Sequence, residues 1–447
     1  MKTLARVSPL FFVLITGCSD DAAEPGADVV QDVSEGDVAA DGQTDDALAD
    51  TPLVDIPSGD TANTGEPGVE CAPAVLEFGE GVAIGDCTTV RGSAAALTSV
   101  EIRPDCTDPE ITALADKNHL VIVPSDVTQD ALWVHFGGSG GQPTNTENIG
   151  EAAAREGYRY ISLAYTNEPS IASRCQCPDG PRPASCDGEV RAEILYGVES
   201  TESFEMHADE AIVPRLVALL TFLDAEQFQQ GWSRYLGADG QPEWEMIAVS
   251  GFSQGGGMAG LIARDHLVAR ALYLSKGADG SLGDSSGATA CATDADCDGG
   301  HCCAEGDFVC DETPASGGLC LVIVPSPWAL AGADIDGDYA GDGGPETRAT
   351  PAERQFAIVH RAEGAWGYSP EVFAAWGMGA RDDFFDADTG AEIPEGTRLF
   401  STGLAPRGDC SEHQSTGSDA CQPRNPDTGD PAMQPVWRFA MSTPVGS

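Results

Sequence analysis

Short runs of consecutive apolar residues alternate with amphipathic stretches along the chain from residue 119 onward. Because the runs are continuous and not interrupted by polar residues, they indicate strands that are buried on both faces. The predicted strands cover residues 119–124, 131–136, 158–165, 246–250, 269–274, 355–360 and 397–401. Apolar residues at helical spacing predict helices over residues 146–156, 212–223 and 257–263. This order predicts an α/β fold with a mostly parallel central sheet and helices on both faces.

The segment that precedes this pattern has a different character. Residues 71–115 contain short alternating stretches, such as residues 98–102, and the folded body is expected to begin near Cys71. The pattern leaves open whether this segment is a small module or the first strands of the main sheet. We therefore treat residues 71–447 as one predicted domain.

The chain contains 15 cysteines, which is many for a protein of a reducing compartment unless the cysteines bind metal. Six of them lie in a predicted Cys-rich insertion at residues 285–325, between two predicted strands. The insertion lacks the paired C-x₂-C sites that are typical of zinc modules, so disulfides are the favoured interpretation and zinc is the alternative.

Residues 1–17 have the organisation of an export signal. A short basic region is followed by apolar residues 10–15, a stretch too short to span a bilayer. The end of the segment, Ile15-Thr16-Gly17-Cys18, resembles a bacterial lipoprotein signal. The resemblance implies cleavage before Cys18, lipidation of Cys18 and, because Ser19 follows, an outer-membrane lipoprotein that is periplasmic or surface-exposed. A plain secretory signal is the alternative.

Charge adds two expectations. Residues 18–70 contain no Lys, Arg or aromatic residue, so they have too little apolar surface to fold and are predicted to form a disordered acidic tether. The whole chain has 72 Asp and Glu against 23 Lys and Arg, a net charge of −49. This charge argues against nucleic acid as a partner and against adsorption to an anionic membrane. Membrane contact is therefore expected through the N-terminal lipid only.

The segment Gly251-Phe252-Ser253-Gln254-Gly255-Gly256 carries the main chemical signal. It fits the G-x-S-x-G nucleophile elbow, and it lies between a predicted buried strand and a helix of small residues. The motif needs glycines because the serine sits in a strained turn, and the start of the helix directs backbone N–H groups toward an oxyanion. The pattern predicts Ser253 as a nucleophile; an ordinary Gly-rich turn is the alternative.

Over residues 118–425 the chain resembles the α/β-hydrolase superfamily, and the string GFSQGG is similar to exported bacterial serine esterases. In that superfamily serine, acid and histidine follow one another along the chain. The resemblance implies His413 as general base in the loop after the last strand, and Glu363 as the acid that orients it. Glutamate departs from the usual aspartate, and Asp279 is the alternative acid. Cys410 and Cys421 bracket His413, so a disulfide between them would restrain that loop.

The resemblance also implies an oxyanion hole made of two backbone N–H groups. One is that of Gln254, directly after the nucleophile, and the other is that of Gly137 or Gly138. His135-Phe136-Gly137-Gly138 resembles the HGG-type motif of esterases and lipases, and glycine allows the backbone to approach a substrate oxygen closely.

Together these features predict a lipid-anchored, extracytoplasmic serine hydrolase that forms an acyl-enzyme. A carboxylic ester hydrolase acting on a small-molecule or polymeric ester is favoured, and neither a cofactor nor a metal is expected. Thioesterase, lipase, peptidase and polyester depolymerase activities are alternatives on the same scaffold. A non-catalytic surface binding or adhesion protein is the alternative from another class. The sequence makes no prediction of the oligomeric state.

Overall fold

The structure is a computed structural model, and not every residue of the chain is described by it. The described residues are 83–84, 87–94, 96–114, 117–175, 186–198, 206–226, 231–276, 280–282, 290–291, 301–304, 318–330 and 348–445. The predicted signal peptide (1–17), the tether (18–70), the lipidation site Cys18 and the alternative acid Asp279 lie outside them. These four predictions stay predictions.

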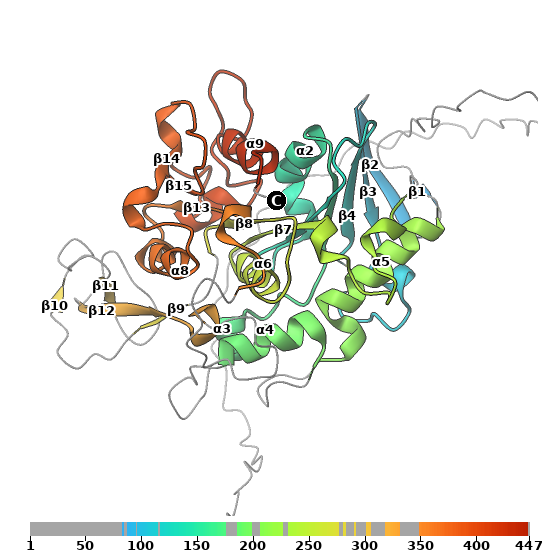
Figure 1. The fold of residues 1–447 in the computed structure, drawn as a ribbon, viewed down its shortest axis with the longest axis horizontal. Helices are drawn as coiled ribbons and strands as arrows, with labels where there is room; N and C mark the ends of the chain where they lie inside the picture. Colours follow the sequence, from blue (N-terminus) through green and yellow to red (C-terminus); the bar gives the residue numbers. More distant parts are fainter. Residues whose placement is uncertain are drawn as a thin grey trace, which may run out of the picture. The chain divides into compact units, whose positions relative to one another are not determined.

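An eleven-stranded sheet runs through the molecule in the order β1-β2-β3-β4-β6-β5-β7-β8-β13-β15-β14 (Figure 1). From β6 to β14 all neighbouring strands are parallel, whereas β4 pairs with β6 in the antiparallel sense. The parallel strands are β6 (Arg159–Leu163), β5 (Leu132–Phe136), β7 (Ile247–Phe252), β8 (Arg270–Leu274), β13 (Gln355–His360), β15 (Leu399–Thr402) and β14 (Phe385–Asp386). The predicted α/β fold with a mostly parallel sheet is confirmed.

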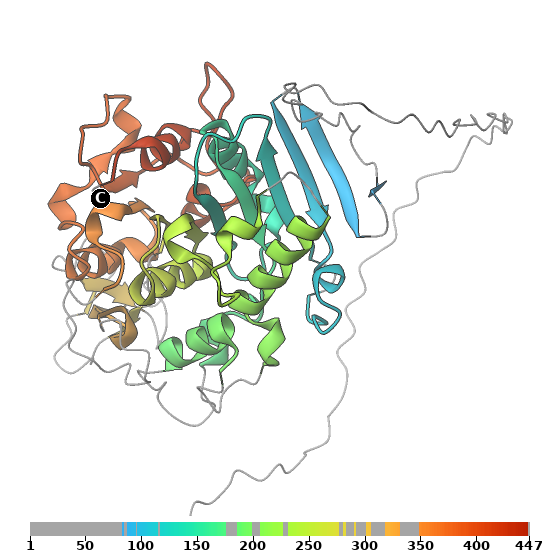
Figure 2. The same ribbon diagram turned by 45° about the vertical axis from the view of Figure 1, so that its right-hand side comes forward.

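Helices cover both faces of this sheet, as Figures 1 and 2 show. On one face α2 (Glu147–Arg155) and α9 (Gln434–Ser442) pack on the sheet through side chains such as Ile149 and Trp437. On the other face lie α4 (Cys186–Tyr196), α5 (Ile212–Ala225), α6 (Gln254–Asp265) and α8 (Ser369–Ala375). Because both faces are covered, the central strands are buried at almost every position, which explains their continuous apolar runs.

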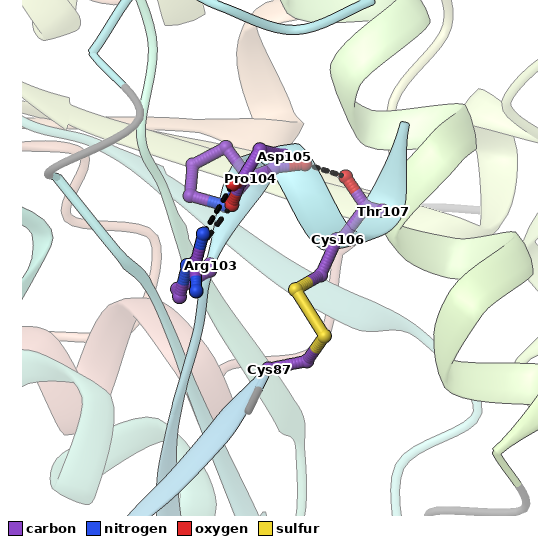
Figure 3. Close-up of a disulfide and its surroundings, with 6 residues drawn as sticks. All are labelled: Cys87, Arg103, Pro104, Asp105, Cys106 and Thr107. Carbon is purple, nitrogen blue, oxygen red and sulfur yellow. Dashed lines mark hydrogen bonds and ion pairs between the residues drawn. A yellow bond between two sulfur atoms is a disulfide. The ribbon is translucent and has the colours of Figure 1, made fainter. Parts of the chain in front are cut away.

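The N-terminal strands belong to the main sheet, which settles the question that the sequence left open. The strands β1 (Ala83–Ile84), β2 (Thr88–Ala94), β3 (Leu97–Ile102) and β4 (His119–Pro124) pair in the antiparallel sense. A disulfide between Cys87 and Cys106 joins the start of β2 to the short helix α1 (Pro104–Thr107) beyond β3 (Figure 3). The Cys87 carbonyl also accepts the Arg103 N–H at 3.0 Å, so a disulfide and a backbone hydrogen bond both hold the start of β2 to the segment after β3.

A separate small sheet is formed by strands of the predicted insertion (285–325) and by one strand that directly precedes it. The strand β12 (Gly318–Pro325) pairs in the antiparallel sense with β9 (Gly280–Leu282), β10 (Ala290–Cys291) and β11 (His301–Ala304). After it comes the short helix α7 (Pro327–Leu330). Cys297 and Cys310 lie outside the described residues, so the predicted disulfides of the insertion stay a prediction. Within the described parts of the chain, no helix is long and apolar enough to cross a bilayer.

Candidate active site

Ser253 occupies the sharp turn between β7 and α6, as the sequence predicted. Its backbone angles are φ 54° and ψ −117°, a conformation that residues other than glycine adopt only at an energetic cost. The Ser253 N–H donates to the Leu274 carbonyl at the end of β8, with 3.0 Å between the nitrogen and the oxygen. The neighbouring strand therefore holds the strained turn in place.

The glycines around Ser253 are required by close backbone contacts. A Cβ atom on Gly251 would lie 2.1 Å from the carbonyl carbon of Gly255. A Cβ atom on Gly255 would lie 2.0 Å from the Phe136 oxygen, and one on Gly256 would lie 1.9 Å from the Lys276 oxygen. No real Cβ atom tolerates such distances. The glycines of the motif are therefore required because the end of β7, the turn at Ser253 and the start of α6 approach neighbouring backbone too closely for a side chain.

His413 lies beside the serine. It is part of the 3₁₀ helix η11 (Glu412–Thr416), and its Nε2 is 2.7 Å from Ser253 Oγ. The imidazole ring packs on Phe252, with 5.0 Å between the ring centroids. The predicted disulfide between Cys410 and Cys421 is present, so the loop that carries His413 is closed covalently.

Glu363 completes a continuous chain of hydrogen bonds. One carboxylate oxygen, Oε2, is hydrogen-bonded to His413 Nδ1, and the other, Oε1, accepts the His360 N–H at 2.8 Å. Glu363 directly follows the turn after β13, and only 6% of its surface is exposed. Because both oxygens have fixed partners, the carboxylate is held in one orientation toward the imidazole.

His360, the other histidine near this acid, has a different set of partners. Its Nδ1 accepts the Ala362 N–H at 3.0 Å, and its Nε2 lies 3.2 Å from the Leu404 carbonyl. A backbone N–H can only donate and a carbonyl can only accept, so Nδ1 is the acceptor and Nε2 carries the proton. Both nitrogens are occupied, and His360 braces the turn that presents Glu363.

The predicted oxyanion donors also lie next to the serine. A Cβ atom on Gly138 would be 3.3 Å from Ser253 Cβ, whereas one on Gly137 would meet nothing within 4 Å. Neither the Gly138 N–H nor the Gln254 N–H donates to another group within the described residues. Gln254 is the first residue of α6, so its N–H also carries the partial positive charge of a helix N-terminus.

Two residues that the sequence analysis did not single out hold the glycine loop. The Tyr165 hydroxyl donates to the Gly137 carbonyl at 2.7 Å, and Asn167 Nδ2 donates to the Gly138 carbonyl at 2.7 Å. Both residues follow β6, the strand next to β5. In a trans peptide the C=O and N–H point in opposite directions, so fixing Gly137 O also fixes the direction of the Gly138 N–H.

His135 lies in the same motif as the glycines but takes no part in the site. It is fully buried, and its Nδ1 lies 2.8 Å from Ser250 Oγ. Burial lowers the pKa of His135 to about 3, so the ring is neutral at physiological pH. As for metals, no group of three or more His, Cys, Asp or Glu side chains in the described residues could hold an ion.

The strand order and the elbow together define the α/β-hydrolase fold. The antiparallel β4 precedes the parallel strands β5 to β8, and the serine lies at the carboxyl end of a central parallel strand, as in that fold. No family model matches the chain, and no curated protein matches its sequence.

Solved structures similar to this chain include several esterases. A thermostable esterase from Pseudomonas putida ECU1011 is 15% identical over 72% of this chain and 76% of its own, with a TM-score of 0.31. An S-formylglutathione hydrolase from Agrobacterium tumefaciens is 13% identical over 41% of this chain and 59% of its own, with a TM-score of 0.26. An inhibited esterase B from Lactobacillus rhamnosis is 14% identical over 41% of this chain and 50% of its own, with a TM-score of 0.23. With TM-scores this low, the fold assignment rests on the strand order and the elbow.

Proposed function

We propose that this protein is a serine hydrolase that cleaves carboxylic esters through an acyl-enzyme. The observation that supports this most is the continuous chain of hydrogen bonds from Ser253 through His413 to Glu363, built at a strained elbow. A nucleophile next to a base that is itself oriented by a carboxylate is the general arrangement for activating a hydroxyl group.

In the proposed reaction Ser253 Oγ attacks the ester carbonyl carbon while His413 Nε2 takes its proton. Glu363 keeps the Nδ1 proton of the imidazole directed toward its own carboxylate, so that Nε2 is free to accept. The N–H groups of Gln254 and Gly138 donate to the oxyanion that forms on the carbonyl oxygen. His413 then gives the proton to the leaving alcohol, and a water molecule repeats the sequence on the acyl-enzyme to release the acid.

We also propose that the protein acts outside the cytoplasm, attached to the outer membrane through lipid on Cys18. The disulfides Cys87–Cys106, Cys175–Cys186 and Cys410–Cys421 support this location, because such bonds persist in oxidising compartments. Incorporation of labelled palmitate that disappears in Cys18→Ala would support the anchor. A soluble, unlabelled wild-type protein in the periplasm would contradict it.

Fluorophosphonate labelling and hydrolysis of p-nitrophenyl acetate test the proposed reaction. The wild-type protein is expected to be labelled and to turn over the ester, and Ser253→Ala to do neither while keeping the wild-type melting temperature. Equal labelling of both proteins, or none of the folded wild type, would favour a binding protein on this scaffold. A panel of a thioester, a long-chain triglyceride, a peptide and a polyester then separates the possible substrate classes.

A further inference from the structure

Ser275 combines an unusual backbone conformation with complete burial. It directly follows β8, its φ is +61°, and its exposed surface is 0%. Residues with a side chain rarely adopt positive φ, and glycine would accept it without strain. The Ser275 N–H donates to the Ile358 carbonyl of β13 at 2.8 Å, which fixes this conformation between two strands.

The Leu274–Ser275 dipeptide touches both reacting partners of the proposed mechanism. The Leu274 carbonyl accepts the N–H of Ser253 at 3.0 Å. The next residue places its hydroxyl against the loop of the base, where Ser275 Oγ donates to the His413 carbonyl at 3.2 Å. Two consecutive residues of one strand end therefore hold the backbones of the nucleophile and of the base.

The Ser275 hydroxyl has a second partner, the buried Thr416 Oγ1. A hydroxyl group carries one hydrogen, and Ser275 uses it on the carbonyl of His413. The Thr416 hydroxyl therefore donates to Ser275 Oγ. The result is a short relay from Thr416 through Ser275 to His413, which ties two residues of η11 to the end of β8.

We propose that Ser275 is a positioning residue, whose hydroxyl fixes the backbone of His413 at the distance from Ser253 that proton transfer requires. The inference rests on the proposed function. It follows from two observations. Ser275 has a side chain at a backbone position where glycine would be unstrained, and the hydroxyl of that side chain donates a hydrogen bond to the carbonyl of the proposed base, His413. Glycine could satisfy the backbone of this strand end but could not hold the histidine loop.

The test compares Ser275→Ala, which removes the hydroxyl, with Ser275→Gly, which removes it and also relieves the backbone. Thr350→Val is the matched control. Thr350 is fully buried and its Oγ1 donates to the backbone carbonyl of another histidine, His266, at 2.6 Å. The control therefore removes the same kind of hydrogen bond from a histidine outside the site.

With p-nitrophenyl acetate, both Ser275 variants are expected to lose about tenfold in kcat while KM stays within about twofold, because one hydrogen bond to the base is lost. Thr350→Val is expected to keep kcat within about twofold of wild type. The second readout is the low-field proton NMR signal of His413 Nδ1–H, which should shift or broaden in both Ser275 variants and stay in place in Thr350→Val.

Three results would overturn the inference. The first is unchanged kcat in Ser275→Ala and Ser275→Gly, and the second is restoration of kcat by Ser275→Gly alone, which would assign the effect to backbone strain. The third is a loss of kcat in the Ser275 variants and in Thr350→Val that is equally proportional to the fall in melting temperature, while the His413 Nδ1–H signal stays in place in all three variants. Failure of the proposed function is seen separately, as wild-type turnover equal to that of Ser253→Ala, and the NMR comparison still decides the role of Ser275 in that case.

Discussion

Replacing Glu363 by glutamine exchanges one carboxylate oxygen for an NH₂ group at almost constant shape. The backbone N–H of His360, 2.8 Å from Oε1, can only donate, so the amide oxygen has to remain on that side. The NH₂ group of the glutamine then faces His413 Nδ1 and donates to it. The imidazole responds by carrying its proton on Nε2, the atom that must accept the proton of Ser253.

The size of the effect follows from this change of tautomer. A base that already carries the proton on its reacting nitrogen cannot take another from a serine hydroxyl without first becoming charged. Replacing the acid of a serine protease triad by its amide costs about 10⁴ in kcat. We therefore expect Glu363→Gln to lose about 10³–10⁴ in kcat, which corresponds to about 4–5.5 kcal/mol of barrier. Its free energy of unfolding is expected to stay within about 2 kcal/mol, because a buried charge and its charged hydrogen bond are lost together.

The assay is steady-state hydrolysis of p-nitrophenyl acetate, accompanied by thermal unfolding. Glu371→Gln is the control, since Glu371 is an exposed carboxylate on α8 that pairs with Arg381 at 3.2 Å. It is expected to behave as wild type. A loss below tenfold in Glu363→Gln would refute the assignment of Glu363 as the orienting acid and would make Asp279 the next acid to replace.

Three further predictions concern the framework around the site. Burial raises the pKa of Asp419 from 3.8 to about 7; its contribution to the free energy of unfolding should thus be full below about pH 4 and fall as the pH rises to 7. Asp419→Asn should flatten this dependence in urea titrations, and an unchanged slope would contradict it. Gly255→Ala should lower the free energy of unfolding in urea by more than about 3 kcal/mol, because its Cβ would lie 2.0 Å from the Phe136 oxygen. A urea unfolding curve equal to that of the wild type would show that the elbow accommodates the added methyl group. Replacing Cys410 and Cys421 together by serine should cost about 3 kcal/mol of unfolding free energy, because it opens a loop with a sequence separation of 11. That pair should also lower kcat, and full activity would show the loop to be self-supporting.

The parts of the site that the sequence could predict are those with local causes. The glycines at 251, 255 and 256 are needed by contacts within one turn and its adjoining strands, so they leave a readable motif. His413 could be found because the chain order of the fold restricts the choice. The buried strands were found because both of their faces are covered, which makes their sequences continuously apolar.

The missing parts depend on contacts between distant segments. Tyr165, Asn167 and Ser275 contact the candidate site through side-chain hydrogen bonds to segments far away in the sequence, and an isolated tyrosine, asparagine or serine gives no periodic signal. The helix α4 was missed for another reason. It is buried almost all round and includes the buried polar residues Arg191 and Glu193, so its apolar positions show no helical stripe.

Because of the disulfide between Cys410 and Cys421, the proposed activity would depend on the redox state of the compartment that holds the protein. In a reducing cytoplasm the segment that presents His413 would keep two free thiols and lack its covalent closure. Under the proposed function, a newly made chain would hydrolyse esters more slowly before this disulfide forms than after it, so its full activity would develop only in an oxidising compartment.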